Sequence, residues 1–114
     1  MKKFLIILLC GIWLTGCSNA DDKMVDYVEA KEKIINNGAI LMDVRTEDEY
    51  NENHISGAVN IPLDSITEAV SLNQDTPIIV YCQSGNRSSQ ALIKLENLGY
   101  TDVYDLGSIN NWEE

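Results

Sequence analysis

From residue 24 onward, the chain alternates between short apolar runs and amphipathic stretches. The clearest apolar run is residues 77–81 (Pro-Ile-Ile-Val-Tyr), whose consecutive apolar, β-branched side chains predict a strand buried on both faces. Short apolar runs at residues 39–44 and 57–61 predict two further strands, and residues 101–106 predict a last one. The sequence therefore predicts several short strands, of which the third in chain order is the most deeply buried.

Amphipathic stretches separate these predicted strands. Helical spacing of apolar residues predicts helices over residues 24–37, 64–72 and 88–98. Thr46 followed by Glu49 has the spacing of an N-terminal capping box, which predicts another helical turn beginning there. Short buried strands that alternate with helices predict an α/β fold, with a mainly parallel central sheet flanked by helices on both faces.

The first residues differ from the rest of the chain. Lys2 and Lys3 precede an apolar run over residues 4–14, which is about half the ~20 residues that a membrane-spanning helix needs. A basic tip, a short apolar run and small residues at a junction are typical of a secretory signal. Residues 14–17 (Leu-Thr-Gly-Cys) are similar to the lipobox of bacterial lipoproteins, in which cleavage makes the cysteine the lipidated first residue.

The lipobox resemblance divides the chain into three parts. We expect a lipoprotein signal peptide at residues 1–16, a lipidated tether at residues 17–23 and one domain at residues 24–114. Lipid on Cys17 would anchor the protein to a bacterial membrane, either the outer membrane facing the periplasm or the cell-surface side of the plasma membrane. The alternative is ordinary signal cleavage, which would leave Cys17 as a free thiol.

The charge balance is strongly acidic. The formal net charge is −10, and removing residues 1–16 takes Lys2 and Lys3 away, so that it falls to −12. Such a domain is expected to avoid nucleic acid and anionic lipid headgroups. An anionic substrate would have to be attracted by local groups, against the field of the whole molecule.

The three cysteines differ in their expected fates. Cys10 leaves with the signal and Cys17 is blocked by lipid, so Cys82 remains as the only free thiol. Exported proteins usually pair their cysteines, and a lone thiol is either buried and inert or kept for its reactivity. Because Cys82 follows the strand predicted at residues 77–81, it lies where open α/β sheets place their sites.

The segment after this strand favours the reactive interpretation. Residues 82–88 read Cys-Gln-Ser-Gly-Asn-Arg-Ser and lead into a predicted helix. Gly85 permits backbone angles that turn successive N–H groups inward, and the helix start adds the positive end of its dipole. Such donors lower the pKa of a thiol and would also stabilise a persulfide anion. Arg87 adds a fixed positive charge and a fork suited to an oxyanion.

These segments together resemble the rhodanese family. The resemblance spans roughly residues 24–112 and is carried by the loop at 82–88, by Asp-Val-Arg at 43–45, by His-Ile-Ser-Gly-Ala-Val-Asn-Ile-Pro at 54–62, and by the segments 98–100 and 106–112. One departure is Gly107-Ser108, where members often have two glycines before the final tryptophan. The resemblance implies a rhodanese-like fold.

The resemblance also implies a sulfurtransferase that works in two steps and needs no cofactor or metal. We expect the protein to be a monomer. A thiolate would take the outer sulfur of a small donor such as thiosulfate, and the resulting persulfide would pass it to cyanide or a thiol. The residues implied are catalytic Cys82, the donor-binding loop of Gln83, Ser84, Gly85, Asn86, Arg87 and Ser88, and the supporting pair Asp43 and Arg45. A pairing of Arg45 with Glu49 is also expected.

Other functions remain to be weighed. A phosphatase of the related fold has five residues between cysteine and arginine, whereas four separate Cys82 from Arg87. A rhodanese-like sulfur carrier or partner-binding module with little thiosulfate activity stays open as the alternative. Gly85 occupies the place of the second cysteine that a disulfide oxidoreductase requires. His54, the only histidine, is interpreted as structural, and one cysteine with one histidine does not make a metal cage.

Overall fold

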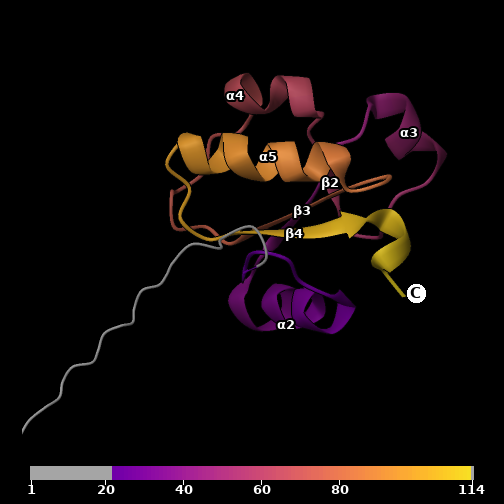
Figure 1. Cartoon of the computed structure of the whole chain (residues 1–114), viewed down its shortest axis with the longest axis horizontal. Coiled ribbons are helices and arrows are strands. Elements are labelled where there is room, and N and C mark those ends of the chain that lie inside the picture. The colour runs from indigo at the N-terminus through magenta and orange to yellow at the C-terminus, as the bar shows by residue number, and fades with distance from the viewer. Residues whose placement is uncertain (1–21, 114) are drawn as a thin grey trace, which may run out of the picture.

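In a computed structural model, which describes residues 22–113, four parallel strands form one sheet with helices on both faces (Figure 1). The strand order is β2-β1-β3-β4. The strands are β1 (Ile40–Asp43), β2 (Val59–Asn60), β3 (Ile78–Cys82) and β4 (Val103–Ser108). The predicted α/β fold with a parallel sheet is confirmed. The predicted signal peptide, Cys17 and most of the predicted tether lie outside the described residues.

Helices connect the strands and cover the sheet from two sides. The helices are α2 (Tyr27–Asn37), α3 (Glu47–Glu52), α4 (Ile66–Ala69) and α5 (Asn86–Asn97), with 3-10 turns at η2 (Leu63–Ser65) and η3 (Ile109–Asn111). Figure 1 shows α4 and α5 on one face of the sheet and α2 on the other. Within residues 22–113, every helix is too short or too polar to cross a membrane.

Strand β3 shows why helices must cover both faces of the sheet. Its five residues are fully buried, and successive side chains point to opposite faces. Ile78, Val80 and Cys82 belong to the apolar cluster under α4 and α5, whereas Ile79 and Tyr81 belong to the cluster under α2. The period of two along β3 thus directs the Cys82 side chain toward α5, the helix that follows it.

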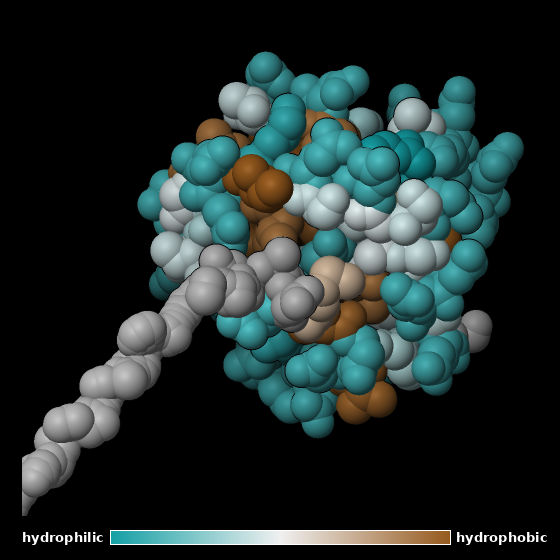
Figure 2. All heavy atoms as spheres, in the orientation of Figure 1, coloured by the Kyte–Doolittle hydropathy of each residue, from teal (hydrophilic) through white to brown (hydrophobic). Residues whose placement is uncertain are grey.

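Polar residues predominate on the molecular face shown in Figure 2, where apolar residues appear in small patches. Six large apolar side chains are exposed in the described part of the chain: Met24, Val28, Ile35, Val59, Leu72 and Ile93. Most of the large apolar side chains therefore lie in the two clusters that enclose the sheet.

Several element boundaries differ from the prediction. Helix α2 starts at Tyr27 rather than at residue 24, because Asp26 caps it and Glu29 completes the capping box. Met24 instead bridges to Asp105 of β4, and the Lys23 carbonyl accepts a hydrogen bond from the Asp105 N–H. The chain therefore joins the sheet edge before its first full helix.

The other differences are shorter or shifted elements. The helix predicted at 64–72 is a 3-10 turn followed by α4, which ends at Ala69, and the strand predicted at 57–61 is only Val59–Asn60. The helix predicted to start at residue 88 starts at Asn86. This last shift affects the site, because it places the first turn of α5 directly beside Cys82.

Candidate active site

Cys82 is the last residue of β3 and is fully buried, at 0% exposure. It pairs in register with Ser108 of β4, at the carboxyl edge of the sheet. It is the only cysteine in the part of the chain that the structure describes, and it is free. Its sulfur therefore lies beneath the loop that follows, shielded from bulk solvent.

Two backbone N–H groups of this loop point at the sulfur. The Gly85 nitrogen lies 2.9 Å from Cys82 Sγ, and the Ser88 nitrogen lies 3.3 Å from it. Gly85 has φ +100°, a left-handed conformation that a residue with a Cβ rarely adopts. This conformation ends the loop within four residues of the strand and lets α5 begin at Asn86.

The thiol pKa reflects a competition between burial and these donors. Burial of the sulfur raises the pKa, but hydrogen bonds from Ser88 (backbone and side chain), Gly85 and Ser84 outweigh it. The net result is a Cys82 pKa below the usual value, which favours the thiolate. The bowl of N–H donors predicted from the sequence is thus present around the sulfur.

Ser88 connects the sulfur to a buried carboxyl group. The Ser88 side chain is fully buried, and its hydroxyl lies 3.1 Å from the Gly85 carbonyl oxygen. The same hydroxyl interacts with Cys82 and Asp105, so three acceptors share its single proton. Asp105 is 2% exposed and accepts from the Gly107 N–H at 2.8 Å. Burial raises the pKa of Asp105, and the hydrogen bonds from Ser88 and Gly107 only partly offset that effect.

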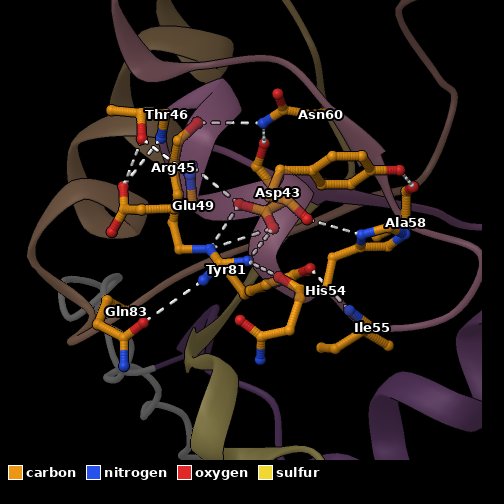
Figure 3. Close-up of polar contacts among 12 residues, drawn as sticks. Asp43, Arg45, Thr46, Glu49, His54, Ile55, Ala58, Asn60, Tyr81 and Gln83 are labelled. Carbon is orange, nitrogen blue, oxygen red and sulfur yellow. Dashed lines mark hydrogen bonds and ion pairs between the residues drawn. The ribbon is translucent and has the colours of Figure 1, made fainter.

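Ser108 and Arg45 anchor the start of the loop through Gln83. The Ser108 hydroxyl donates to the Gln83 carbonyl at 2.7 Å, and Arg45 Nη1 lies 3.4 Å from Gln83 Oε1. The Ser108 hydroxyl thus supplies a contact that a glycine at this position would lack. Figure 3 shows the Gln83 side chain reaching toward Arg45.

Asp43 and Arg45 form the centre of a polar network beside the loop (Figure 3). Arg45 Nη2 lies 2.7 Å from Asp43 Oδ2, and Arg45 Nε lies 3.0 Å from Asp43 Oδ1. The pair is buried, and Arg45 Nη2 also donates to the Asn53 carbonyl. Asn60 donates to the carbonyl oxygens of Asp43 and Arg45, which ties β2 to the same network.

The only histidine is exposed and lies at the edge of this network. The His54 ring stacks on Tyr50 with 3.7 Å between centroids, and its Nδ1 lies 2.9 Å from the Tyr50 carbonyl oxygen. The next residue, Ile55, donates its N–H to the Tyr81 hydroxyl. These contacts hold the segment between α3 and β2 and are consistent with the structural role predicted for His54.

Arg87 forms an ion pair with Glu49, a residue that was predicted to pair with Arg45. Arg87 Nη1 lies 2.7 Å from Glu49 Oε1, and Arg87 Nη2 lies 3.0 Å from Glu49 Oε2. The predicted pairing of Arg45 with Glu49 is wrong, because the buried Arg45 is held by Asp43 instead. The hydrogen bonds from Arg87 and Thr46 lower the pKa of Glu49 to about 2.

The remaining loop side chains face solvent. Gln83, Ser84 and Asn86 are exposed, and the Asn86 side chain accepts a hydrogen bond from Gln90 one turn along α5. Of the predicted loop residues, Ser84, Gly85 and Ser88 thus contribute donors to the Cys82 sulfur, most of them backbone N–H groups. Glu49, Asp105 and Ser108 were not predicted as site residues, and only Glu49 carried a local signal, its capping box with Thr46.

Comparison with known proteins agrees with this geometry. A family model for the rhodanese-like domain matches residues 26–114. Thiosulfate sulfurtransferase PspE of Escherichia coli is 34% identical over 73 residues, covering 61% of this chain and 70% of that protein. Thiosulfate sulfurtransferase GlpE of Coxiella burnetii is 29% identical over 93 residues, covering 80% of this chain and 87% of that protein.

Solved structures show the same likeness. A human single-domain sulfurtransferase, TSTD1, superimposes with a TM-score of 0.72 at 25% identity, over 79% of this chain and 94% of that one. A rhodanese with anions from E. coli superimposes with a TM-score of 0.61 at 33% identity, over 64% of this chain and 89% of that one.

Proposed function

The chain belongs to the rhodanese-like family, and on this premise we propose that it transfers a sulfane sulfur through a persulfide on Cys82. The observation that carries the proposal is the pair of N–H groups, from Gly85 and Ser88, that point at the Cys82 sulfur. Relatives named as thiosulfate sulfurtransferases support this class of reaction.

The first half-reaction loads the cysteine. The Cys82 thiolate attacks the outer sulfur of thiosulfate, a new S–S bond forms, and the bond to the central sulfur breaks with release of sulfite. The negative charge of the thiolate moves to the outer sulfur of the resulting persulfide. The amide groups that lower the thiol pKa favour this anion for the same electrostatic reason, so no general base is required.

The second half-reaction removes the sulfur from Cys82. Cyanide or a thiolate attacks the outer sulfur, the S–S bond to Cys82 breaks, and the thiolate is regenerated. Splitting one transfer into two steps allows donor and acceptor to use the same site in turn. The shape of the loop is maintained by Gly85, by the Ser108 contact to Gln83, and by the buried pair of Asp43 and Arg45.

We also propose that the protein is exported and anchored by lipid on Cys17. The basic tip, the apolar run over residues 4–14 and the lipobox-like residues 14–17 support this placement. The domain would then act outside the cytoplasm. Metabolic labelling with a fatty acid analogue tests the anchor, and loss of label in Cys17→Ala together with release from the membrane fraction is the expected result.

The decisive experiment on the reaction is mass spectrometry of the protein after treatment with thiosulfate. We expect Cys82 to gain the mass of one sulfur atom and to lose it on addition of cyanide, with formation of thiocyanate. Cys82→Ser should abolish both signals. An unmodified Cys82 in folded protein, with every sulfur donor offered, would contradict the proposal.

A sulfur carrier with little thiosulfate activity is the second candidate. The ion pair that occupies Arg87 favours it, because that guanidinium is not free to bind a dianion. Such a carrier would form the Cys82 persulfide from other donors and transfer it to a protein or small thiol. Turnover of an aryl phosphate that depends on Cys82 would contradict sulfur transfer and indicate a phosphatase instead.

A further inference from the structure

Both guanidinium groups beside the sulfur loop are already paired with carboxylates. Arg87 is held by two oxygens of Glu49, at 2.7 and 3.0 Å, and Arg45 is held by both oxygens of Asp43. The pKa of Arg87 is raised, chiefly by its hydrogen bonds to Glu49 and to a smaller extent by the Cys82 thiolate. The nearest cations are therefore present, but their charges are largely cancelled at the point where a donor would arrive.

The remaining cations of residues 22–113 lie elsewhere. Lys23 pairs with Glu96 near the far end of α5, and Lys94 lies in the last turn of that helix. Lys31 and Lys33 lie on α2, over the rings of Trp112 and Tyr104 respectively. The helix α2 covers the face of the sheet opposite to the one that Cys82 faces (Figure 1). Attraction of an anion to the loop thus depends mainly on backbone N–H groups.

Glu49 is fixed in place independently of any donor. Its Oε1 accepts from the Thr46 N–H and the Thr46 hydroxyl, both at 3.0 Å, as part of the capping box that starts α3 (Figure 3). The side chains of Arg87 and Glu49 are 33% and 32% exposed, so the pair lies at the surface beside the loop that carries Cys82. A donor that used the Arg87 fork would have to displace a carboxylate that is held by other bonds.

We propose that Glu49 selects sulfur donors of low negative charge, by cancelling the charge of Arg87 at the mouth of the loop. This inference rests on the proposed function and specifies its substrate class: monoanionic or neutral sulfane-sulfur donors are used in preference to dianions such as thiosulfate. The backbone amide dipoles can stabilise one negative charge on a donor. A second negative charge is repelled by the carboxylate of Glu49 and by the strongly acidic domain.

Two donors that differ in charge by one unit provide the test. Thiosulfate carries two negative charges, and methanethiosulfonate carries one. The Cys82 thiolate attacks the terminal sulfur of methanethiosulfonate, an S–S bond forms, and methanesulfinate leaves with its electron pair. The products are a persulfide anion and a sulfinate anion, so atoms and charge balance as they do for thiosulfate.

The experiment compares the rate constant for persulfide formation on Cys82 from each donor, in the full chain and in two variants. Glu49→Gln removes the charge but keeps a side chain that can complete the capping box with Thr46. Asp48→Asn, on the same helix, removes one charge from an exposed residue. It is therefore the control for a general change in net charge.

We expect Glu49→Gln to raise the rate ratio of thiosulfate to methanethiosulfonate roughly fivefold to tenfold, and Asp48→Asn to change it less than about twofold. Higher ionic strength should raise the same ratio in the wild type, because it screens the repulsion of the dianion. A merely structural role for Glu49 would slow both donors equally and leave the ratio unchanged.

The outcomes separate this inference from the proposed function. Persulfide formation with either donor supports the function, and an unchanged ratio in Glu49→Gln then overturns only the role of Glu49. An equal rise of the ratio in both variants also overturns it, since overall charge would explain the effect. If neither donor loads folded wild-type protein, the proposed function fails and the inference fails with it.

Discussion

Asp43 and Arg45, two positions apart in the chain, form a buried ion pair with 2.7 Å between Arg45 Nη2 and Asp43 Oδ2. The two side chains are 0% and 2% exposed. Asp43 ends β1 and Arg45 reaches from there to the carbonyl of Asn53 and the side chain of Gln83. The pair thus joins the centre of the sheet to the loop that carries Cys82.

Asp43→Asn should be strongly destabilising. The change leaves the Arg45 charge buried without its carboxylate, and breaking a buried pair in this way costs about 3–5 kcal/mol of unfolding free energy. Urea unfolding at pH 7 would measure the loss. The matched control is Glu47→Gln, which removes an exposed carboxylate nearby and should change the free energy by less than ~0.5 kcal/mol. Equal effects of the two variants would refute a special role for the pair.

Ser88→Ala should raise the pKa of Cys82. The side chain and backbone of Ser88 both help to lower this pKa against the effect of burial, and alanine keeps only the backbone donor. The thiolate fraction at a given pH should therefore fall. The pH dependence of Cys82 alkylation in the variant should have its midpoint at higher pH than in the wild type. Ser89→Ala, whose hydroxyl donates to the Asn86 carbonyl on the exposed side of α5, is the control.

Gly85→Ala should impair the loop more than the fold. A Cβ at Gly85 meets no atom closer than 3.8 Å, so the cost arises from φ +100° and not from a clash. That cost is about 1–2 kcal/mol. If the backbone relaxes, the Gly85 N–H turns away from the sulfur and persulfide formation slows.

Gly38→Ala is the matched control for this strain. Gly38 ends α2 with φ +69° and also has open space around its Cβ position. Its substitution should cost a comparable free energy of unfolding without changing the rate of Cys82 loading. Equal loss of rate in both variants would show that stability, and not the loop geometry, limits the reaction.

Asp105→Asn should stabilise the domain at neutral pH. Burial raises the pKa of this carboxyl group above its usual value of 3.8. The contribution of Asp105 to folding stability is therefore most favourable below pH 3.8, where the group is protonated. It is lost as the pH rises through the higher folded pKa, because a buried negative charge is then required. The variant should melt a few degrees higher than the wild type at pH 7, with little gain at pH 3. Asp75→Asn, which removes one carboxylate from an exposed turn, is the control for a general change in net charge.

The ion pair of Glu49 and Arg87 should contribute most to folding stability at neutral pH and least at strongly acidic pH. The pKa of Glu49 is lowered from 4.5 to about 2 by Arg87 and Thr46, so its contribution to stability is fully present above pH 4.5. It is lost as the pH falls toward 2, where the carboxylate is protonated. The stability difference between wild type and Glu49→Gln should therefore shrink over this range. A difference that stays constant between pH 6 and pH 2 would contradict the assigned cause.

The sequence determined the elements that depend on local pattern. The alternation of short apolar runs with amphipathic stretches was enough to predict a parallel sheet, and the end of the β3 run at Cys82 placed a thiol at the carboxyl edge of that sheet. The Thr46 and Glu49 capping box was also predicted and is present. Propensity and periodicity act over one or two turns, so they are readable without the fold.

Only the tertiary structure decided which charges meet. Glu49 and Arg87 are 38 residues apart, and they pair because β1 and β3 are neighbours and bring the segments that follow them together. The contacts of Ser108 with Gln83, and of Asp105 with Ser88, likewise depend on β4 lying beside β3. Ion pairing is set by spatial proximity and by burial, neither of which is encoded in the spacing of residues along the chain. For this reason the sequence could place the sulfur, but not the carboxylate that controls the charge beside it.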